Sequence, residues 1–124
     1  MKHGKPAPSV DTWIEETKRQ SDTGELGMVL VHRGIVRTTS KAGGLVTKMN
    51  LTYDAERLDA LLGTFRAQKG ITEIRVWINE GELAIGDDIM SVLVAGRYRT
   101  DVLPVFEALV AAIKNEVVRE RELS

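Results

Sequence analysis

The chain has 124 residues, of which 43% are hydrophobic and 28% charged, the size and composition of a single soluble globular domain. Its formal net charge of −1 excludes an overall field that would attract nucleic acid or an anionic membrane, so any anion site must be local. The absence of cysteine excludes disulfides, a thiolate nucleophile and a cysteine zinc site, and two distant histidines make a weak metal site. We therefore expect no metal and no resident cofactor.

The N-terminal segment is basic and contains two prolines within residues 1–9. No apolar signal core follows it, and no apolar stretch approaches the roughly 18 residues of a membrane-spanning helix. We expect a cytoplasmic protein with one domain over residues 1–124, in which residues 1–9 form a flexible leader.

The first predicted elements are a helix, a strand and a loop. Ser9 or Asp11 can cap a short helix over residues 12–20. Residues 27–36 are rich in β-branched and apolar side chains and predict a strand. Residues 38–44 have no periodicity and end in two glycines, which indicates a mobile surface loop.

The middle of the chain predicts a strand, a helix and a second strand. Residues 45–53 alternate between polar and apolar, as in a half-buried strand. Asp54 can cap a helix whose apolar residues recur at helical spacing as far as Lys69, and Gly70 suits its C-terminal end. Residues 71–78 again read as a strand.

The last third of the chain predicts a strand and a long helix. Residues 81–87 link the preceding strand to the apolar strand 89–96. Pro104 falls in the first turn of the final helix, and the apolar stripe of this helix reaches Val117. The order of helices and strands is αββαββα, which favours an α+β single domain with a mostly antiparallel sheet and flanking helices.

Lys114 is the first candidate for chemistry. It lies four residues after Val110 and seven before Arg121, which places the three on one ridge of the predicted helix. Desolvation at the rim of the apolar stripe, together with neighbouring cations, would favour a neutral amine that can act as nucleophile or base. The simpler interpretation is a lysine that extends along the rim of the core to reach water.

Arginines follow two of the predicted strands and form a candidate anion pocket. They are Arg37 after the first strand, and Arg97 and Arg99 around Tyr98 after the last strand. The planar fork of donors on arginine suits phosphate, provided that the strand ends are adjacent. The simpler interpretation is that charged residues mark the points where strands return to solvent. His32, in mid-strand, is interpreted as structural.

These residues, in this order, resemble the large, catalytic subunit of molybdopterin synthase, the MoaE family. The resemblance runs from the first helix to about Arg121. Its pieces are Gly34-Ile35-Val36-Arg37, Tyr53, the segment from Gly81 to Ile89, Arg99 and Lys114.

The resemblance implies an α/β hammerhead-type fold and a homodimer that binds one small ubiquitin-like subunit at each end, giving a heterotetramer. It implies sulfur transfer from the thiocarboxylated C-terminal Gly-Gly tail of that subunit to cyclic pyranopterin monophosphate, a step of molybdenum cofactor biosynthesis. Lys114 would be the central catalytic lysine, and Arg37 and Arg99 would bind the substrate phosphate.

The chain also departs from the family pattern. Tyr98 stands where the family usually has histidine, and Arg121 stands where it has a second functional lysine. Arginine keeps the charge but does not serve as an amine nucleophile at neutral pH. We therefore keep two hypotheses, an active synthase subunit and a non-catalytic binding or assembly module with the same fold.

Overall fold

The computed structural model describes residues 5–124 of the chain. In chain order, the elements are α1 (Val10–Gln20), β1 (Met28–Ile35), β2 (Lys48–Tyr53), α2 (Ala55–Arg66), β3 (Ile71–Ile78), β4 (Gly81–Ala84), β5 (Asp88–Gly96), α3 (Arg99–Ala112), the π-helical turn η1 (Ile113–Val117) and β6 (Val118–Leu123). The strands form two three-stranded antiparallel sheets.

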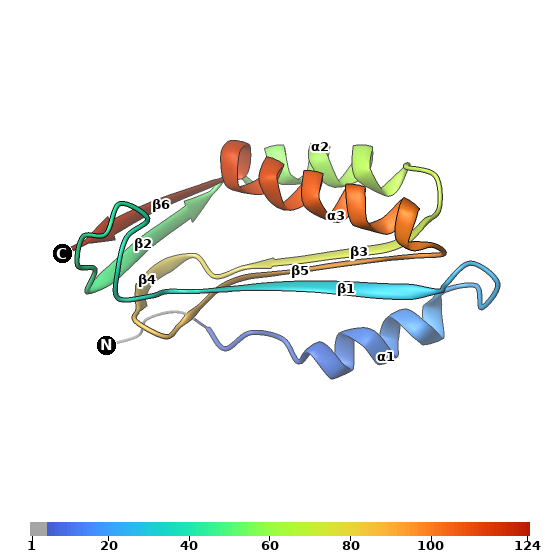
Figure 1. Cartoon of the computed structure of the whole chain (residues 1–124), viewed down its shortest axis with the longest axis horizontal. Helices are drawn as coiled ribbons and strands as arrows, with labels where there is room; N and C mark the ends of the chain where they lie inside the picture. The colour runs from blue at the N-terminus through green and yellow to red at the C-terminus, as the bar shows by residue number, and fades with distance from the viewer. Residues whose placement is uncertain (1–4) are drawn as a thin grey trace.

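The larger sheet has the order β1-β5-β3 and lies between helices. Figure 1 shows α2 and α3 over one face of this sheet and α1 against the other. The central strand β5 is buried along almost its whole length, as its continuous apolar sequence predicts for a strand covered on both faces. The main apolar cluster lies on the face covered by α2 and α3, and it includes no residue of α1.

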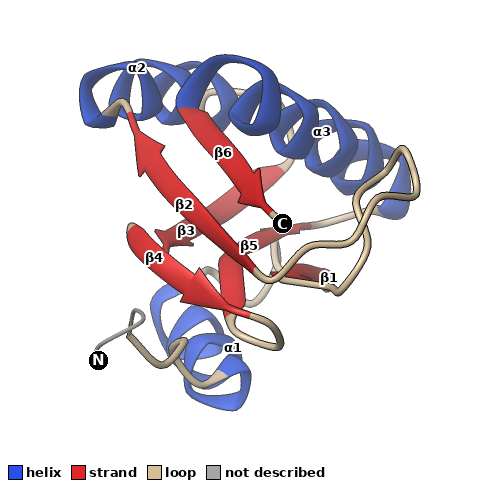
Figure 2. Cartoon of the chain, turned by 90° about the vertical axis from the view of Figure 1, so that its left-hand side faces the viewer, coloured by secondary structure: helices blue, strands red, loops and turns tan. Residues whose placement is uncertain are grey.

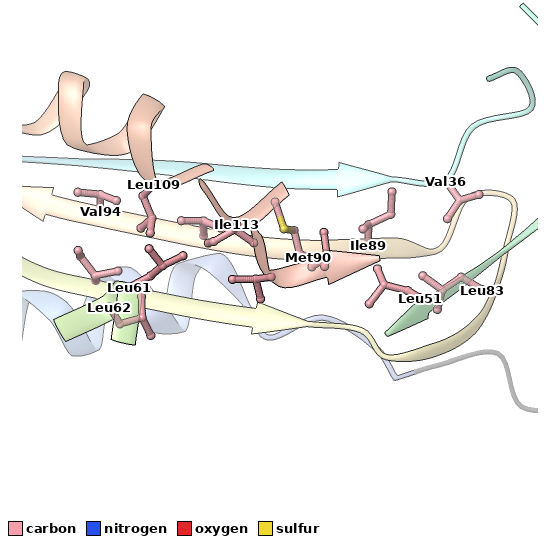
Figure 3. Packing of buried hydrophobic residues seen from close by; sticks show 14 of the residues in the cluster. Val36, Leu51, Leu61, Leu62, Leu83, Ile89, Met90, Val94, Leu109 and Ile113 are labelled. Carbon is pink, nitrogen blue, oxygen red and sulfur yellow. The ribbon is translucent and has the colours of Figure 1, made fainter. Parts of the chain in front are cut away.

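The smaller sheet has the order β4-β2-β6 and lies beyond one end of the larger sheet (Figure 2). Its buried side chains include Leu51 of β2 and Leu83 of β4, which belong to the same apolar cluster as Met90 of β5. Figure 3 shows Leu51 and Leu83 beside Ile89 and Val36 at the junction of the sheets. This contact fixes the two sheets relative to each other.

The α+β single-domain prediction is confirmed, and several elements agree closely with their predicted ranges. The strand predicted over residues 71–78 is β3 without change. Ser9 caps α1 by accepting a hydrogen bond from the backbone N–H of Thr12, and Asp54 caps α2 in the same way through Arg57. In β2, Met49 and Leu51 are buried, as its alternating pattern predicts.

The prediction of the last helix was wrong at both ends. The helix begins at Arg99, with Tyr98 as its N-cap, so Pro104 lies in the second turn. It ends at Ala112, and after η1 the chain forms strand β6 along β2. Pairing with β6 satisfies the backbone N–H and carbonyl groups on one edge of β2, which a longer helix would leave without a partner strand.

The segment after β3 was also predicted incorrectly. Residues 81–84 form strand β4, which pairs with β2 instead of serving only as a link to β5. The turn that follows contains Gly86 at φ 89°, and the side chain of Asp87 accepts a hydrogen bond of 2.8 Å from the backbone N–H of Ala84. The smaller sheet thus has a strand on each side of β2.

Two segments expected to be flexible make specific hydrogen bonds. Asn79 accepts one from the backbone N–H of Lys5 at 2.9 Å, and the carbonyl of Pro8 accepts one from Arg33 at 2.6 Å. The remainder of the predicted leader, residues 1–4, lies outside the described residues. In the loop 38–44, Ser40 donates its backbone N–H to the carbonyl of Gly44 at 2.8 Å. Among residues 5–124 no helix is long and apolar enough to cross a membrane.

Gly96 provides a test of the packing between sheet and helix. A Cβ there would lie 2.2 Å from the carbonyl oxygen of Gly70 and 2.7 Å from Cγ2 of Val102. Gly96→Ala should therefore lower the free energy of unfolding by about 2 kcal/mol or more in urea titrations. Gly63→Ala is the matched control, because a Cβ at this position in α2 meets no atom within 4 Å and alanine favours the helix. Equal losses in the two variants would contradict this packing.

Candidate active site

A cavity of about 550 Å³ lies where the end of β1, the end of α3 and strand β6 meet. Its apolar lining includes Met49, Ile89 and Val110. Its charged and titratable lining consists of His32, Arg37, Lys41, Lys114, Glu120 and Glu122. The cavity therefore combines cations for an anionic ligand with an amine, and it brings together Arg37 and Lys114, which the resemblance assigns to one site.

The π-helical turn η1 places Lys114 at the cavity. Ile113 and Val117 are buried on either side of it, whereas the three residues between them are exposed. The backbone N–H of Val118 donates to the carbonyl of Ile113, which closes the wide turn and directs the chain into β6. The ridge predicted from Val110 through Lys114 to Arg121 therefore does not form, because the helix has ended.

Arg37 is held at the cavity by the residue before it. The side chain of Val36 is buried, its backbone N–H donates to the carbonyl of Asp87 at 2.9 Å, and its carbonyl accepts from Gly86 at 2.8 Å. These contacts bind the chain after β1 to the turn before β5. The guanidinium of Arg37 then projects from a fixed backbone, beside the loop that carries Lys41.

Strand β6 supplies the two carboxylates of the cavity. Glu120 lies opposite Leu51 and Glu122 opposite Met49 in the register with β2, so these residues share the face that points to the core. Arg121 lies opposite Asn50 on the other face and does not line the cavity. A catalytic role for Arg121 remains a prediction, without a contact to Lys114 in its favour.

Lys114 is paired, whereas the two other cations are not. Its ammonium donates to a carboxylate oxygen of Glu120, with side-chain exposures of 40% for Lys114 and 20% for Glu120. The side chains of Arg37 and Lys41 make no hydrogen bond or ion pair with any described residue. They are available to an anionic ligand.

His32 also faces this cavity, from the middle of β1. Burial lowers the pKa of His32 below its usual 6.5, and the positive charge of Lys114 lowers it further. The imidazole is therefore neutral at pH 7 and can accept a proton. No sequence pattern indicates this proximity, because only the fold brings His32 near Lys114.

Arg97, Tyr98 and Arg99 lie at the opposite end of α3 from Lys114. The 14 residues of this helix separate the two groups by about 20 Å at a rise of roughly 1.5 Å per residue. Arg97 donates to Asp101 at 2.8 Å and lies 5.3 Å from the centre of the Tyr98 ring. Within one chain, the predicted cluster of these residues with Arg37 and Lys114 does not form.

A second hollow, of about 340 Å³, lies between the end of β2 and η1. It is lined by residues that include Tyr53, Glu116 and Arg119, and it contains no residue that the sequence singled out for catalysis. Among residues 5–124 no group of three histidine or acidic side chains is placed to hold a metal ion. The cavity around Lys114 is therefore the better candidate for an active site.

Comparisons with known proteins found one matching family model and several solved structures with a similar fold. A family model described as "MoaE protein" matches residues 8–116. The X-ray structure of molybdopterin synthase from Staphylococcus aureus is 19% identical, with a TM-score of 0.76 over 99% of this chain and 92% of that one. A complex of subunits 1 and 2 of molybdopterin-converting factor from Helicobacter pylori is 17% identical, with a TM-score of 0.72 over 92% of this chain and 75% of that one.

The MoaE protein of Burkholderia ambifaria has a TM-score of 0.75 at 17% identity, over 97% of this chain and 82% of that one. No curated protein sequence matches the chain.

The placement of His32 predicts a pH dependence of stability. Because its pKa is lower in the folded protein than in the unfolded chain, the unfolded chain binds the proton more readily. Stability is thus lost as the pH falls through about 6.5, and the loss levels off below the folded-state pKa. His32→Gln should remove this loss. In urea titrations, the free energy of unfolding of the variant should therefore rise relative to that of the wild type between about pH 7.5 and about pH 5.5. A stability difference that stays constant over this range would contradict the burial of His32 beside Lys114.

Proposed function

The chain belongs to the MoaE family, because the family model covers residues 8–116, and we propose that it is the large subunit of a molybdopterin synthase. In this role it acts in molybdenum cofactor biosynthesis, by transfer of sulfur from a small subunit to cyclic pyranopterin monophosphate. The observation that carries the proposal is the cavity that holds Lys114 and Arg37 together. The Helicobacter pylori complex of two molybdopterin-converting subunits supports a small-subunit partner.

The partner proposed here is a small ubiquitin-like protein whose C-terminal Gly-Gly tail carries a thiocarboxylate. Such a tail is narrow and anionic, and the cavity offers it unpaired cations and apolar lining residues. Lys114 would meet the carbonyl at the end of the tail, where the C–S bond breaks and the sulfur stays with the pterin. Its amine would either form the C–N bond that replaces this C–S bond or assist acyl transfer.

Arg37 would bind the phosphate of the pterin substrate. Its guanidinium has no competing partner among the described residues, and a planar fork of donors can contact two phosphate oxygens at once. Lys41 adds a second cation from the neighbouring loop. The neutral His32 completes the set as a proton acceptor close to Lys114.

A homodimer would explain the position of Arg97, Tyr98 and Arg99. These residues lie too far from Lys114 of the same chain to contact the same substrate. In a two-fold dimer, Arg99 of one protomer would lie at the cavity of the other, so that the site is formed at the boundary between the subunits. A purely monomeric protein in sedimentation velocity would contradict this arrangement.

The activity test uses purified wild type, a thiocarboxylated small subunit and cyclic pyranopterin monophosphate, with molybdopterin formation as the readout. Lys114→Ala should lower the rate by about a hundredfold or more, since loss of a nucleophile or base commonly costs at least that factor. Arg37→Ala should mainly raise the KM for the pterin, by about tenfold, through loss of charge-assisted hydrogen bonds. Lys69→Ala, in the turn after α2, is the matched control and should leave both constants unchanged.

Wild type that binds the small subunit yet forms no product would overturn the catalytic proposal in favour of a binding or assembly module. Full activity in Lys114→Ala would remove Lys114 from the reaction.

A further inference from the structure

The proposed function does not use the ion pair between Lys114 and Glu120. The ammonium of Lys114 donates to Oε2 of Glu120, and this is the only ion pair among the described residues that line the cavity. Glu120 is the more buried of the two, with 20% of its side chain exposed against 40% for Lys114. A partly buried pair of this kind is screened less by water and salt than an exposed one.

The carboxylate of Glu120 is held by the strand that carries it. Glu120 lies opposite Leu51 in the register of β6 with β2, and both the backbone N–H and the hydroxyl of Thr47 donate to the carbonyl of Leu123 near the end of the strand. The family match ends at residue 116, so β6 and its carboxylates lie outside the matched region. The contact between Glu120 and Lys114 is therefore a feature of this chain that the family match does not cover.

The charges around Lys114 show what this contact does. Arg37 and Lys41 approach from the segment after β1, the neutral His32 from β1, and Glu122 from the same face of β6 as Glu120. Within residues 5–124, only Glu120 forms a hydrogen bond or ion pair with the amine. The carboxylate of Glu120 occupies the position beside the amine that an incoming anion would take.

We propose that Glu120 is a positioning residue that holds the side chain of Lys114 in an ion pair and competes with the anionic ligand of the cavity for it. An anion that binds Arg37 and Lys41 and reaches Lys114 displaces Glu120, so that the amine is released only when a ligand is in place. The inference rests on the proposed function only for the identity of that ligand, the thiocarboxylate tail of a small subunit.

The direct test is the rate at which Lys114 is acetylated by an amine-reactive ester, followed by peptide mass spectrometry on the full chain without partner or substrate. Glu120→Gln keeps the shape of the side chain and removes its charge. It should raise the rate at Lys114 by about threefold or more, the factor expected for a half-exposed ion pair. Lys48 and Lys69 are internal references whose rates should not change.

Glu122→Gln is the matched control, because it removes the same charge from the same cavity but does not touch Lys114. If Glu120→Gln and Glu122→Gln change the rate equally, the effect is that of the general field and the proposal fails. An unchanged or lower rate in Glu120→Gln also overturns it. Urea titrations of each variant show whether it is folded.

The second measurement concerns competition. In the synthase assay, Glu120→Gln should lower the KM for the thiocarboxylated small subunit by about threefold, whereas a residue that only supports the fold would lower kcat instead. A higher KM in Glu120→Gln contradicts competition. If wild type shows no turnover, the proposed function fails, and the acetylation rates still decide the role of Glu120.

Discussion

The exit from α3 is the constraint on which the candidate site depends. Ile113 and Val117 are both buried, and the π-helical turn between them pushes Lys114 outward while it turns the chain into β6. The carbonyl of Val117 also accepts a hydrogen bond of 2.9 Å from the backbone N–H of Asp54, so the turn is tied to the start of α2. Because π-helical turns are rare and often occur at functional sites, the position of Lys114 here supports its assignment.

The same turn determines the charge balance of the cavity. By ending the helix, it allows β6 to bring Glu120 to Lys114, and it leaves Arg121 on the opposite face of the sheet. The cavity thus has unpaired cations towards β1 and a paired amine towards β6. An anionic ligand would meet the first group without competition and the second only by displacing a carboxylate.

Much of the fold could be predicted because the relevant signals are local. The alternation in residues 45–53, the cap at Asp54 and the strand pattern in residues 71–78 each determine an element within a few residues. Strand β4 has only four residues, too few for a periodic signal. Strand β6 consists mainly of charged residues of alternating sign, and it forms a strand because it pairs with the edge of β2. The family resemblance assigned Arg37, Arg99 and Lys114 to one site. It could not show that, within one chain, the length of α3 separates Arg99 from the other two.

A crystal structure of the protein in complex with a thiocarboxylated or carboxylated small subunit tests the account most directly. We expect that the C-terminal tail of the small subunit enters the cavity between β1 and β6, that its last carbonyl lies in contact with Nζ of Lys114, and that Glu120 has moved away from that amine. A tail bound instead in the hollow beside Tyr53 and Arg119, with Lys114 and Glu120 still paired, would contradict it.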